Sequence, residues 1–324
     1  MGFRIFADIA VPPTTLKLLR EITEGHQLLL PSKPAASVLH KADPDPLLYT
    51  ADIAFGQPDP DALVNARQLK WVHVSSSSIT RYDNPAIRKL MAERNVVVTN
   101  SASVYAEACA EHALAFMLAQ SRQLPVALRT RVPGGDPNWQ ALRSSLVPLR
   151  GQTVLIVGYG AIGKRLVELL GPFGMKIIAF RRNARGDEEV PIINQAQLEL
   201  TTARGFNHIV NILPDSTSTY HFFDAARFHK MRPGAVFYNI GRGSTVNQDA
   251  LYDALRSGGL KAAWLDVTDP EPLPDEHPLY TLPNCFVTPH VAGGHRGESE
   301  TLLRHFQENL NRFVRVQPLL DRVM

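Results

Sequence analysis

The stretch Val154-Leu155-Ile156-Val157-Gly158-Tyr159-Gly160-Ala161-Ile162-Gly163 decides the fold: four apolar residues run into three glycines spaced G-x-G-x-x-G. Lys164–Leu170 follows as a helix-forming segment, and strand, glycine turn and helix in this order indicate a dinucleotide-binding unit. Gly158 permits the tight turn, Gly160 lets the backbone approach a pyrophosphate, and Gly163 lets the helix lie close to the strand. The pyrophosphate is expected at the helix N-terminus, where free N–H groups and the helix dipole favour an anion. The alternative interpretation is a glycine turn in a βα unit that binds no nucleotide.

Length, composition and charge narrow the class of protein. With 324 residues the chain is long enough for about two domains, and its 44% hydrophobic and 20% charged residues are typical of a globular protein. The net charge is only +3 and the basic residues are scattered, so we expect no nucleic-acid partner. Cys109 and Cys285 have neither a disulfide pattern nor metal-ligand spacing, so we expect reduced thiols and no metal. The N-terminus lacks the apolar run of a signal peptide, and no segment approaches the ~20 apolar residues of a membrane span, so we expect a cytoplasmic protein without membrane contact.

Strands alternate with helices in the first third of the chain, which predicts a parallel sheet with helices on its faces. No second G-x-G-x-x-G pattern occurs there, so this segment is expected to form a small α/β domain without its own nucleotide loop. Its expected strands are Arg4–Ile9, His26–Leu30, Ala51–Phe55, Leu69–Val74 and Asn95–Thr99.

The dinucleotide-binding part begins at Gly151, and six strands joined by helical crossovers predict a doubly wound sheet. Ligands bind beyond the carboxyl ends of the strands in sheets of this kind. The expected strands are Val154–Val157, Met175–Phe180, His208–Leu213, Ala235–Asn239, Ala262–Asp266 and Cys285–Thr288.

A long apolar helix is expected over Tyr105–Leu124, which contains no Gly or Pro. Because it is apolar on most of its surface, we expect it to be buried and to link two domains. Glu111 and His112 within it are expected to be polar caps or interface contacts rather than ligands.

The remaining segments complete the expected organisation. Gly and Pro residues predict an irregular surface loop over Pro125–Leu149, and Glu298–Val316 predicts a closing helix that packs on the first domain. We therefore expect a substrate domain made of residues 1–100 with 296–324, and a dinucleotide-binding domain made of residues 101–295.

The second strand of the dinucleotide-binding unit ends in Arg181-Arg182-Asn183, where an NAD-binding unit usually carries an acid for the ribose 2′-hydroxyl. Asp187 and Glu188 are expected to lie too far into the next loop to take that place. Two guanidinium groups suit a 2′-phosphate, because Arg holds phosphate in a forked geometry. We therefore expect NADP(H) to be preferred over NAD(H), although a solvated basic turn that tolerates NAD(H) is the alternative.

Three further stretches follow the last three strands: Tyr238–Gly243, Leu265–Leu273 and Thr288–Gly293. They place an Arg, a Glu and a His beyond neighbouring strand ends, so the three side chains can converge. In these stretches the chain resembles the D-isomer-specific 2-hydroxyacid dehydrogenase family, through N-x-x-R-G, D-V-x-x-x-E-P-L-P and T-P-H-x-A-G in order after the glycine loop. The resemblance covers nearly the whole chain. It implies a doubly wound Rossmann domain inserted in a smaller flavodoxin-like α/β substrate domain, and reversible reduction of a 2-oxo acid to a D-2-hydroxy acid with a nicotinamide cofactor.

The resemblance implies three catalytic residues. Arg242 would bind the substrate carboxylate and polarise the keto oxygen, since a forked Arg contact orients a small anion. His290 would act as the general acid that protonates this oxygen, and Glu271 would pair with His290 and favour its charged form. The residues implied to contact the cofactor are Gly158, Gly160, Ala161, Ile162, Gly163, Arg181, Arg182, Pro214, Ile240 and Asp266.

The first domain is expected to supply the other wall of a pocket between the domains, at Ser77 and Ser78. Relatives commonly have Ala-Gly or a similar pair there, with backbone N–H groups facing the carboxylate. Ser in place of Gly would be strained in a left-handed conformation. Either the loop differs, or the hydroxyls add donors to the substrate, or the Ser run is only a polar turn.

The sequence therefore predicts an NADPH-preferring reductase of small 2-oxo acids, of the glyoxylate or hydroxypyruvate reductase kind. The family implies a homodimer formed through Tyr105–Leu124. The alternatives are an NAD-dependent D-2-hydroxyacid dehydrogenase and a non-catalytic protein that senses a dinucleotide. A pure binding protein need not keep the complete set of Arg242, Glu271 and His290.

Overall fold

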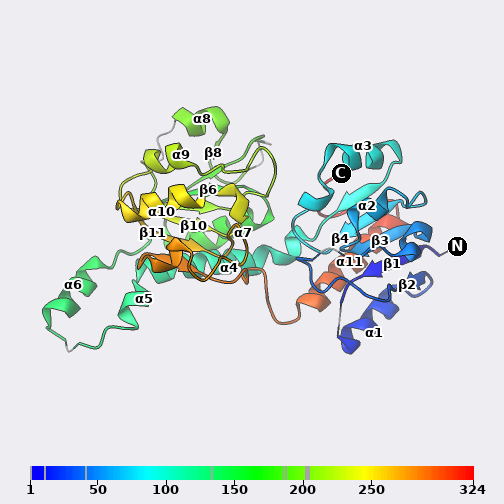
Figure 1. Ribbon diagram of the computed structural model, residues 1–324, viewed down its shortest axis with the longest axis horizontal. Helices are drawn as coiled ribbons and strands as arrows, with labels where there is room; N and C mark the ends of the chain where they lie inside the picture. The colour runs from blue at the N-terminus through cyan, green and yellow to red at the C-terminus, as the bar shows by residue number, and fades with distance from the viewer. Residues whose placement is uncertain are drawn as a thin grey trace. The chain divides into compact units, whose positions relative to one another are not determined.

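The computed structural model describes residues 2–10, 12–40, 42–132, 134–184, 186, 188–200 and 205–324. The chain forms two compact units: unit 1 is Met1–Tyr105 with Gly294–Met324, and unit 2 is Ala106–Gly293 (Figure 1). These limits differ from the expected domain boundaries, 1–100 with 296–324 and 101–295, by a few residues.

Unit 1 is a five-stranded parallel sheet in the order β2-β1-β3-β4-β5, an order known from flavodoxin-like folds. Its three N-terminal α-helices each begin with a proline at the first helical position, and Asp59 and Asn84 accept hydrogen bonds from the first turns of α2 and α3. The strands are β1 (Arg4–Asp8), β2 (Gln27–Leu29), β3 (Ile53–Gly56), β4 (Trp71–Val74) and β5 (Val97–Thr99). The helices are α1 (Pro13–Ile22), α2 (Pro60–Leu63), α3 (Pro85–Glu93) and α11 (Glu298–Val314), with 3₁₀ turns at Pro46–Thr50 and Thr80–Tyr82.

The C-terminal part of the chain completes unit 1. Leu303, Phe306 and Leu310 of α11 are buried against the sheet, and the Phe306 ring stacks on Phe55 with 4.3 Å between ring centroids. Figure 1 shows α11, from the red end of the colour scale, among the blue strands of this unit. The prediction that the closing helix packs on the first domain is confirmed.

Unit 2 is a seven-stranded parallel sheet in the order β12-β11-β10-β9-β6-β7-β8. The chain starts in the middle of this sheet at β6, adds β7 and β8 on one side, and then adds β9 to β12 on the other, so the predicted doubly wound fold is confirmed. The strands are β6 (Thr153–Val157), β7 (Lys176–Phe180), β8 (Ile192–Ile193), β9 (His208–Asn211), β10 (Ala235–Asn239), β11 (Leu260–Leu265) and β12 (Cys285–Val287). The helices are α4 (Ala102–Ser121, which begins in unit 1), α5 (Leu124–Ala127), α6 (Pro137–Ser145), α7 (Ala161–Leu170), α8 (Gln195–Leu200), α9 (Ala225–Lys230) and α10 (Gln248–Arg256), with 3₁₀ turns at Gly171–Phe173, Gly243–Thr245 and Pro278–Thr281.

Two local predictions for unit 2 were wrong. The segment Pro125–Leu149 is not an irregular loop throughout, because it contains most of α5 and the whole of α6. Asp136 accepts a hydrogen bond from the backbone N–H of Asn138 and a proline follows it at the first helical position, which is a helix start that the Gly and Pro content concealed. Strand β8 was not predicted, since two residues are too short for a recognisable pattern.

The long helix α4 is only partly buried: Ala110, Ala113 and Met117 are inaccessible, whereas an exposed strip runs along Ser103, Glu107, Glu111 and Ala115. Helices α5 and α6 stand away from the sheet of unit 2 (Figure 1), and neither contains a buried residue. Within the described residues, no helix combines the length and the apolar character that crossing a membrane requires.

Candidate active site

The glycine loop joins β6 to α7, and its three glycines meet different demands. A Cβ on Gly158, where φ is 111°, would lie 2.8 Å from the carbonyl oxygen of Ile212, and a Cβ on Gly163 would lie 2.5 Å from the carbonyl oxygen of Gly158. A Cβ on Gly160 would meet no atom of the described chain within 4 Å. Gly158 is therefore required by close packing against the segment after β9, and Gly163 by close packing against Gly158, whereas Gly160 faces open space.

The open space lies in front of the helix N-terminus, because Gly160 is the N-cap of α7. The first N–H groups of the helix, including those of Ala161 and Ile162, have no partner within the helix and carry the positive end of its dipole. A dinucleotide pyrophosphate needs donors of this kind and no side chain above them, so the residues present fit it.

The loop also lies at the point where the chain order of the sheet reverses. Strand β6 pairs with β7 on one side and with β9 on the other. Pro214 comes shortly after β9, and the N–H of Ile240, after β10, donates to the carbonyl oxygen of Asn211 over 3.1 Å. The residues expected to contact the cofactor thus follow neighbouring strands at one edge of the sheet, where ligands of doubly wound sheets bind.

The end of β7 differs from the expectation in one respect. Glu188 does not lie too far into the next loop: its Oε1 is 3.3 Å from Nη1 of Arg181, and the two side chains are only 5% and 19% exposed. The exposed Arg182 donates to the hydroxyl of Ser218 over 2.5 Å. Asp187, named in the same expectation, lies outside the described residues. This contact of Glu188 could not be predicted from the sequence, because spacing along a loop does not indicate how the loop folds.

Arg242 stands between two glycines that close packing requires. A Cβ on Gly241 would lie 2.7 Å from the carbonyl oxygen of Leu213, and a Cβ on Gly243 would lie 1.9 Å from that of Thr268. The carbonyl oxygen of Arg242 accepts from the hydroxyl of Thr245 over 2.6 Å. The backbone is therefore fixed on both sides of the arginine, whose side chain is half-buried beyond the end of β10.

His290 and Glu271 are brought together although they follow different strands. Nδ1 of His290 is hydrogen-bonded to Oε1 of Glu271. His290 has a left-handed backbone (φ 51°), and its N–H donates to the carbonyl oxygen of Asp266 over 2.9 Å. With Nδ1 engaged by a carboxylate, Nε2 is the ring nitrogen left to exchange a proton with a substrate.

Asp266 holds the segment that carries His290. Its Oδ1 accepts from the hydroxyl of Thr288 (2.6 Å) and from the N–H of Val291 (2.9 Å), and its Oδ2 accepts from the N–H of Ala292 (2.9 Å). Nε2 of His112 lies 3.6 Å from Oδ1 of Asp266, and burial lowers the pKa of this histidine despite the nearby carboxylate. Asp266 is buried, so these contacts fix the turn after β12 from within. His112 is thus a polar contact of this turn, and the sequence did not indicate its partner.

The serine loop of unit 1, Ser75–Ser78, follows β4. The hydroxyl of Ser76 donates to the carbonyl oxygen of Ser78 over 2.7 Å, and the hydroxyl of Ser78 pairs with that of Thr80 over 2.8 Å. Ser78 is not among the described residues with positive φ, so it avoids the strain that a glycine-like conformation would impose. The hydroxyls of this loop bond to one another's backbone, to Thr80 and to the side-chain amide of Gln57.

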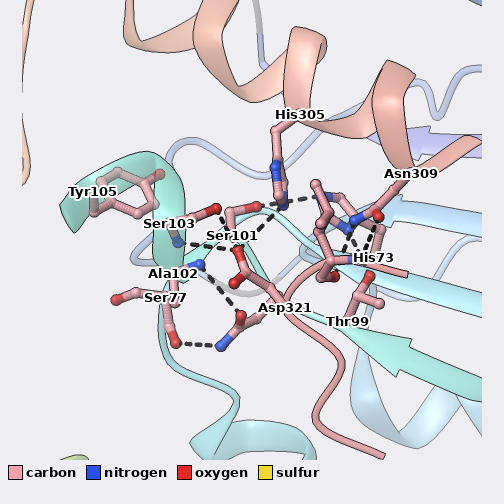
Figure 2. Close-up of polar contacts among 12 residues, drawn as sticks. His73, Ser77, Thr99, Ser101, Ala102, Ser103, Tyr105, His305, Asn309 and Asp321 are labelled. Atoms are coloured by element: carbon pink, nitrogen blue, oxygen red, sulfur yellow. Dashed lines mark hydrogen bonds and ion pairs between the residues drawn. The ribbon is translucent and has the colours of Figure 1, made fainter. Parts of the chain in front are cut away.

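A polar network, buried at His73 and reaching the surface at Ser103, lies at the base of this loop (Figure 2). Oδ2 of Asp321 accepts from the N–H and the hydroxyl of Ser103 at the start of α4, over 3.0 and 2.6 Å, and lies 3.3 Å from Nε2 of His305 on α11. On β4, the ring of His73 contacts the hydroxyls of Thr99 (2.6 Å) and Ser101 (3.3 Å). These contacts tie β4, the start of α4, α11 and the C-terminal segment together within unit 1.

Two carbonyl oxygens of the serine loop accept hydrogen bonds from side chains in and just before α4. The side-chain amide of Asn100 donates to the carbonyl oxygen of Ser77 over 2.7 Å, and the hydroxyl of Tyr105 donates to that of Ser75 over 3.0 Å. With its carbonyl oxygens turned to these donors, the loop is fixed by partners from distant parts of the sequence.

A glycine loop at the switch point of a doubly wound sheet, with an imidazole–carboxylate pair beyond neighbouring strands, defines a dinucleotide-binding enzyme. Comparisons with known proteins agree. The family model described as D-isomer specific 2-hydroxyacid dehydrogenase, NAD binding domain, matches residues 114–292. The human glyoxylate reductase/hydroxypyruvate reductase is 36% identical to this chain, over 78% of the chain and 76% of its own length.

Relatives from microorganisms match over nearly the full length. A glyoxylate reductase of Thermococcus litoralis is 29% identical, over 96% of this chain and 94% of its own. The crystal structure of the NADPH-dependent glyoxylate/hydroxypyruvate reductase of Sinorhizobium meliloti, in complex with NADP and malonate, has a TM-score of 0.74 and 25% identity, and covers 100% of this chain and 97% of that one. The chain belongs to the D-isomer-specific 2-hydroxyacid dehydrogenase family and is an NAD(P)-dependent oxidoreductase.

Proposed function

We propose that this protein reduces a small 2-oxo acid to the D-2-hydroxy acid, with NADPH preferred over NADH. The observation that carries the proposal is the His290–Glu271 pair beyond β12 and β11, with Arg242 beyond the adjacent strand β10. The names of the human, Thermococcus and Sinorhizobium relatives support glyoxylate or hydroxypyruvate as the substrate class.

The roles follow from the chemistry of the side chains. Arg242 binds the carboxylate of the 2-oxo acid through its forked donors and places a positive charge beside the keto oxygen. A nicotinamide cofactor, when bound, supplies the hydride that reduces the keto carbon. His290 gives the proton on Nε2 to the keto oxygen, which becomes the 2-hydroxyl group, and Glu271 stabilises the imidazolium before transfer.

We assign the backbone of Ser77 and Ser78 to the substrate carboxylate as well. The hydroxyl of Ser78 is paired with that of Thr80 in the following 3₁₀ turn, which supports the backbone N–H groups, rather than this hydroxyl, as the donors. Asp266 has both carboxylate oxygens engaged by the segment that carries His290, so its contribution at the nicotinamide end is proposed to be that of a support for this segment.

The preference for NADPH rests on Arg181 and Arg182 at the end of β7. A 2′-phosphate can accept from both guanidinium groups, whereas a 2′-hydroxyl gains little from them. We also propose a homodimer. Exposed apolar residues on and next to α5 support a contact in this region that extends beyond α4: Leu124, Val126 and Leu128 are 42%, 50% and 80% exposed.

The test measures turnover and binding separately. Purified protein is given NADPH or NADH with glyoxylate, hydroxypyruvate or phenylpyruvate, and loss of the reduced cofactor is followed by absorbance. His290→Gln is expected to keep its affinity for NADPH and to lose turnover by roughly a hundredfold or more, because the proton donor is gone. His295→Gln, at an exposed histidine, is the matched control and is expected to keep turnover.

Other outcomes would redirect the assignment. Near wild-type turnover of His290→Gln would remove this residue from the role of general acid. Tight NADPH binding without turnover of any 2-oxo acid would favour the dinucleotide-sensing alternative. A higher kcat/KM with NADH than with NADPH would favour the NAD-dependent alternative.

A further inference from the structure

We propose that Glu188 is a specificity-determining residue, which sets the balance between NADPH and NADH by competing with a ribose 2′-phosphate for the guanidinium group of Arg181. This inference deepens the proposed function and rests on its placement of the ribose at the end of β7. It concerns a carboxylate that comes from beyond the strand end, where position in the sequence gives no indication of it.

The first observation is the contact itself. Oε1 of Glu188 lies 3.3 Å from Nη1 of Arg181, and the carboxylate is almost completely buried. Charges at this distance interact far more strongly when they are shielded from water than on an exposed surface. The positive charge of Arg181 is therefore largely compensated within the chain.

The second observation is that the carboxylate is held in place by the backbone. Oε2 of Glu188 accepts from the N–H of Gly186 over 2.8 Å, so both oxygens have defined partners. Glu188 also lies close to the glycine loop. Burial raises the pKa of Tyr159, between Gly158 and Gly160, and the negative charges of Glu189 and Glu188 raise it further. Glu188 therefore belongs to the corner in which the adenine ribose of a dinucleotide is expected.

The two arginines of this corner differ in their partners. Arg182 is exposed and donates to the neutral hydroxyl of Ser218, a contact that a phosphate can join without displacing a charge. Arg181 is paired with the carboxylate of Glu188. A 2′-phosphate can therefore bind Arg181 only if the ion pair between Arg181 and Glu188 is weakened or broken. The like charges of the carboxylate and the phosphate add to this cost.

A dinucleotide without the 2′-phosphate avoids this cost. Its ribose 2′-hydroxyl can donate to a carboxylate, which is the usual recognition of NAD in dinucleotide-binding folds. Glu188 thus acts against NADPH and is neutral or favourable toward NADH. Arg182 favours NADPH throughout, and the net preference for one cofactor is expected to be the difference between the two effects.

The experiment measures dissociation constants of NADPH and NADH by fluorescence titration, without any substrate. Glu188→Gln removes the negative charge but keeps an oxygen that can accept from Gly186. We expect its affinity for NADPH to rise about tenfold while its affinity for NADH stays level or falls a few-fold. Glu189→Gln, which removes the same charge from the exposed neighbour, is the matched control and is expected to change the ratio of the two constants less than about twofold.

A double-mutant cycle tests whether the effect acts through Arg181. In an Arg181→Gln background, Glu188→Gln is expected to give no gain in NADPH affinity, because the group that it releases is missing. A gain that persists there, an equal change in Glu189→Gln, or a ratio that stays within about twofold of wild type would each overturn the proposal. Failure to turn over 2-oxo acids with these binding changes intact would reject only the proposed function, and normal turnover with an unchanged ratio would reject only the role of Glu188.

Discussion

The glycine loop of unit 2 and the serine loop of unit 1 both follow a strand of a parallel sheet, but they differ in what they expose. The first exposes its backbone, and the second has its side chains hydrogen-bonded to neighbouring groups. The glycine loop after β6 in unit 2 works through missing side chains, since a Cβ on Gly160 would occupy free space in front of α7. The serine loop after β4 in unit 1 keeps its side chains and bonds them inward, to itself and to Gln57. A loop that presents bare backbone can be recognised from its sequence alone, whereas a loop that depends on distant partners cannot.

The largest effects are expected from alanine at two positions of the glycine loop. Gly163→Ala places a Cβ 2.5 Å from a backbone oxygen and is expected to lower the free energy of unfolding by about 2–4 kcal/mol. Gly160→Ala meets no neighbouring atom of the described chain and has negative φ, so stability is expected to stay within about 0.5 kcal/mol of wild type. Because its methyl group fills the space in front of the helix N-terminus, its affinity for NADPH is expected to fall at least tenfold.

Thermal unfolding and fluorescence titration of the two variants separate these effects. Equal loss of stability in both would show that Gly160 is also a packing residue. Unchanged cofactor affinity in Gly160→Ala would break the assignment of this space to a pyrophosphate.

A smaller effect is expected on stability when the pH is lowered, because of His73 on β4, the strand that precedes the serine loop. Burial, with a further contribution from the charge of His305, lowers the pKa of His73 to about 3, although Asp321 acts in the opposite direction. In the unfolded chain this histidine takes up a proton near its ordinary pKa of 6.5, whereas in the folded chain it does not, so stability is lost as the pH falls below about 6.5 and toward about 3. The expected slope from His73 is about 1.4 kcal/mol per pH unit.

Urea unfolding between about pH 6.5 and about pH 4.5 measures this slope. His73→Asn is expected to be less stable at every pH but to show a slope smaller by about 1.4 kcal/mol per pH unit. His229→Asn, at an exposed position, is the control for the loss of a histidine. Equal slopes for wild type and His73→Asn would mean that this histidine does not stay neutral inside unit 1.

The smallest effect is expected at the serine loop itself. Ser78→Ala removes only the hydrogen bond between the hydroxyls of Ser78 and Thr80 and the acceptor for the backbone N–H of Thr80. KM for the 2-oxo acid is therefore expected to change less than about threefold. Ser76→Ala, in contrast, removes a buried hydroxyl that serves both Gln57 and Ser78, and about 1–2 kcal/mol of stability is expected to be lost. A tenfold rise in KM for Ser78→Ala with unchanged stability would instead assign its hydroxyl to the substrate.

The sequence was sufficient for the fold class and for placing the candidate site residues after particular strands. Strands of a parallel sheet end at one edge, so Arg242, Glu271 and His290 could be placed beyond neighbouring strands from the strand pattern alone. The contact between His290 and Glu271 is consistent with that expectation, and the family resemblance is confirmed by the comparisons.

The features that the sequence did not predict depend on tertiary contacts between segments that are brought together by the fold. Glu188 reaches Arg181 through the fold of a loop, and no periodicity encodes such a return. His112 meets Asp266 from a helix far away in the sequence. The start of α6 at Asp136 was overlooked because the neighbouring glycines and prolines suggested a loop. In each case the deciding contact is tertiary or a single cap, and composition reports neither.

The assembly of unit 1 from both ends of the described sequence has a consequence for synthesis on the ribosome. Phe306 on α11 and the backbone of Val323, which donates to the carbonyl oxygen of Val98, complete the core and the sheet edge of this unit. Both are synthesised only after the last residue of unit 2, Gly293. The N-terminal strands therefore keep one apolar face of their sheet exposed until α11 is available, and we expect unit 2 to fold before unit 1. A released chain that ends just before α11 should contain a folded cofactor-binding unit 2 and an incomplete, aggregation-prone unit 1.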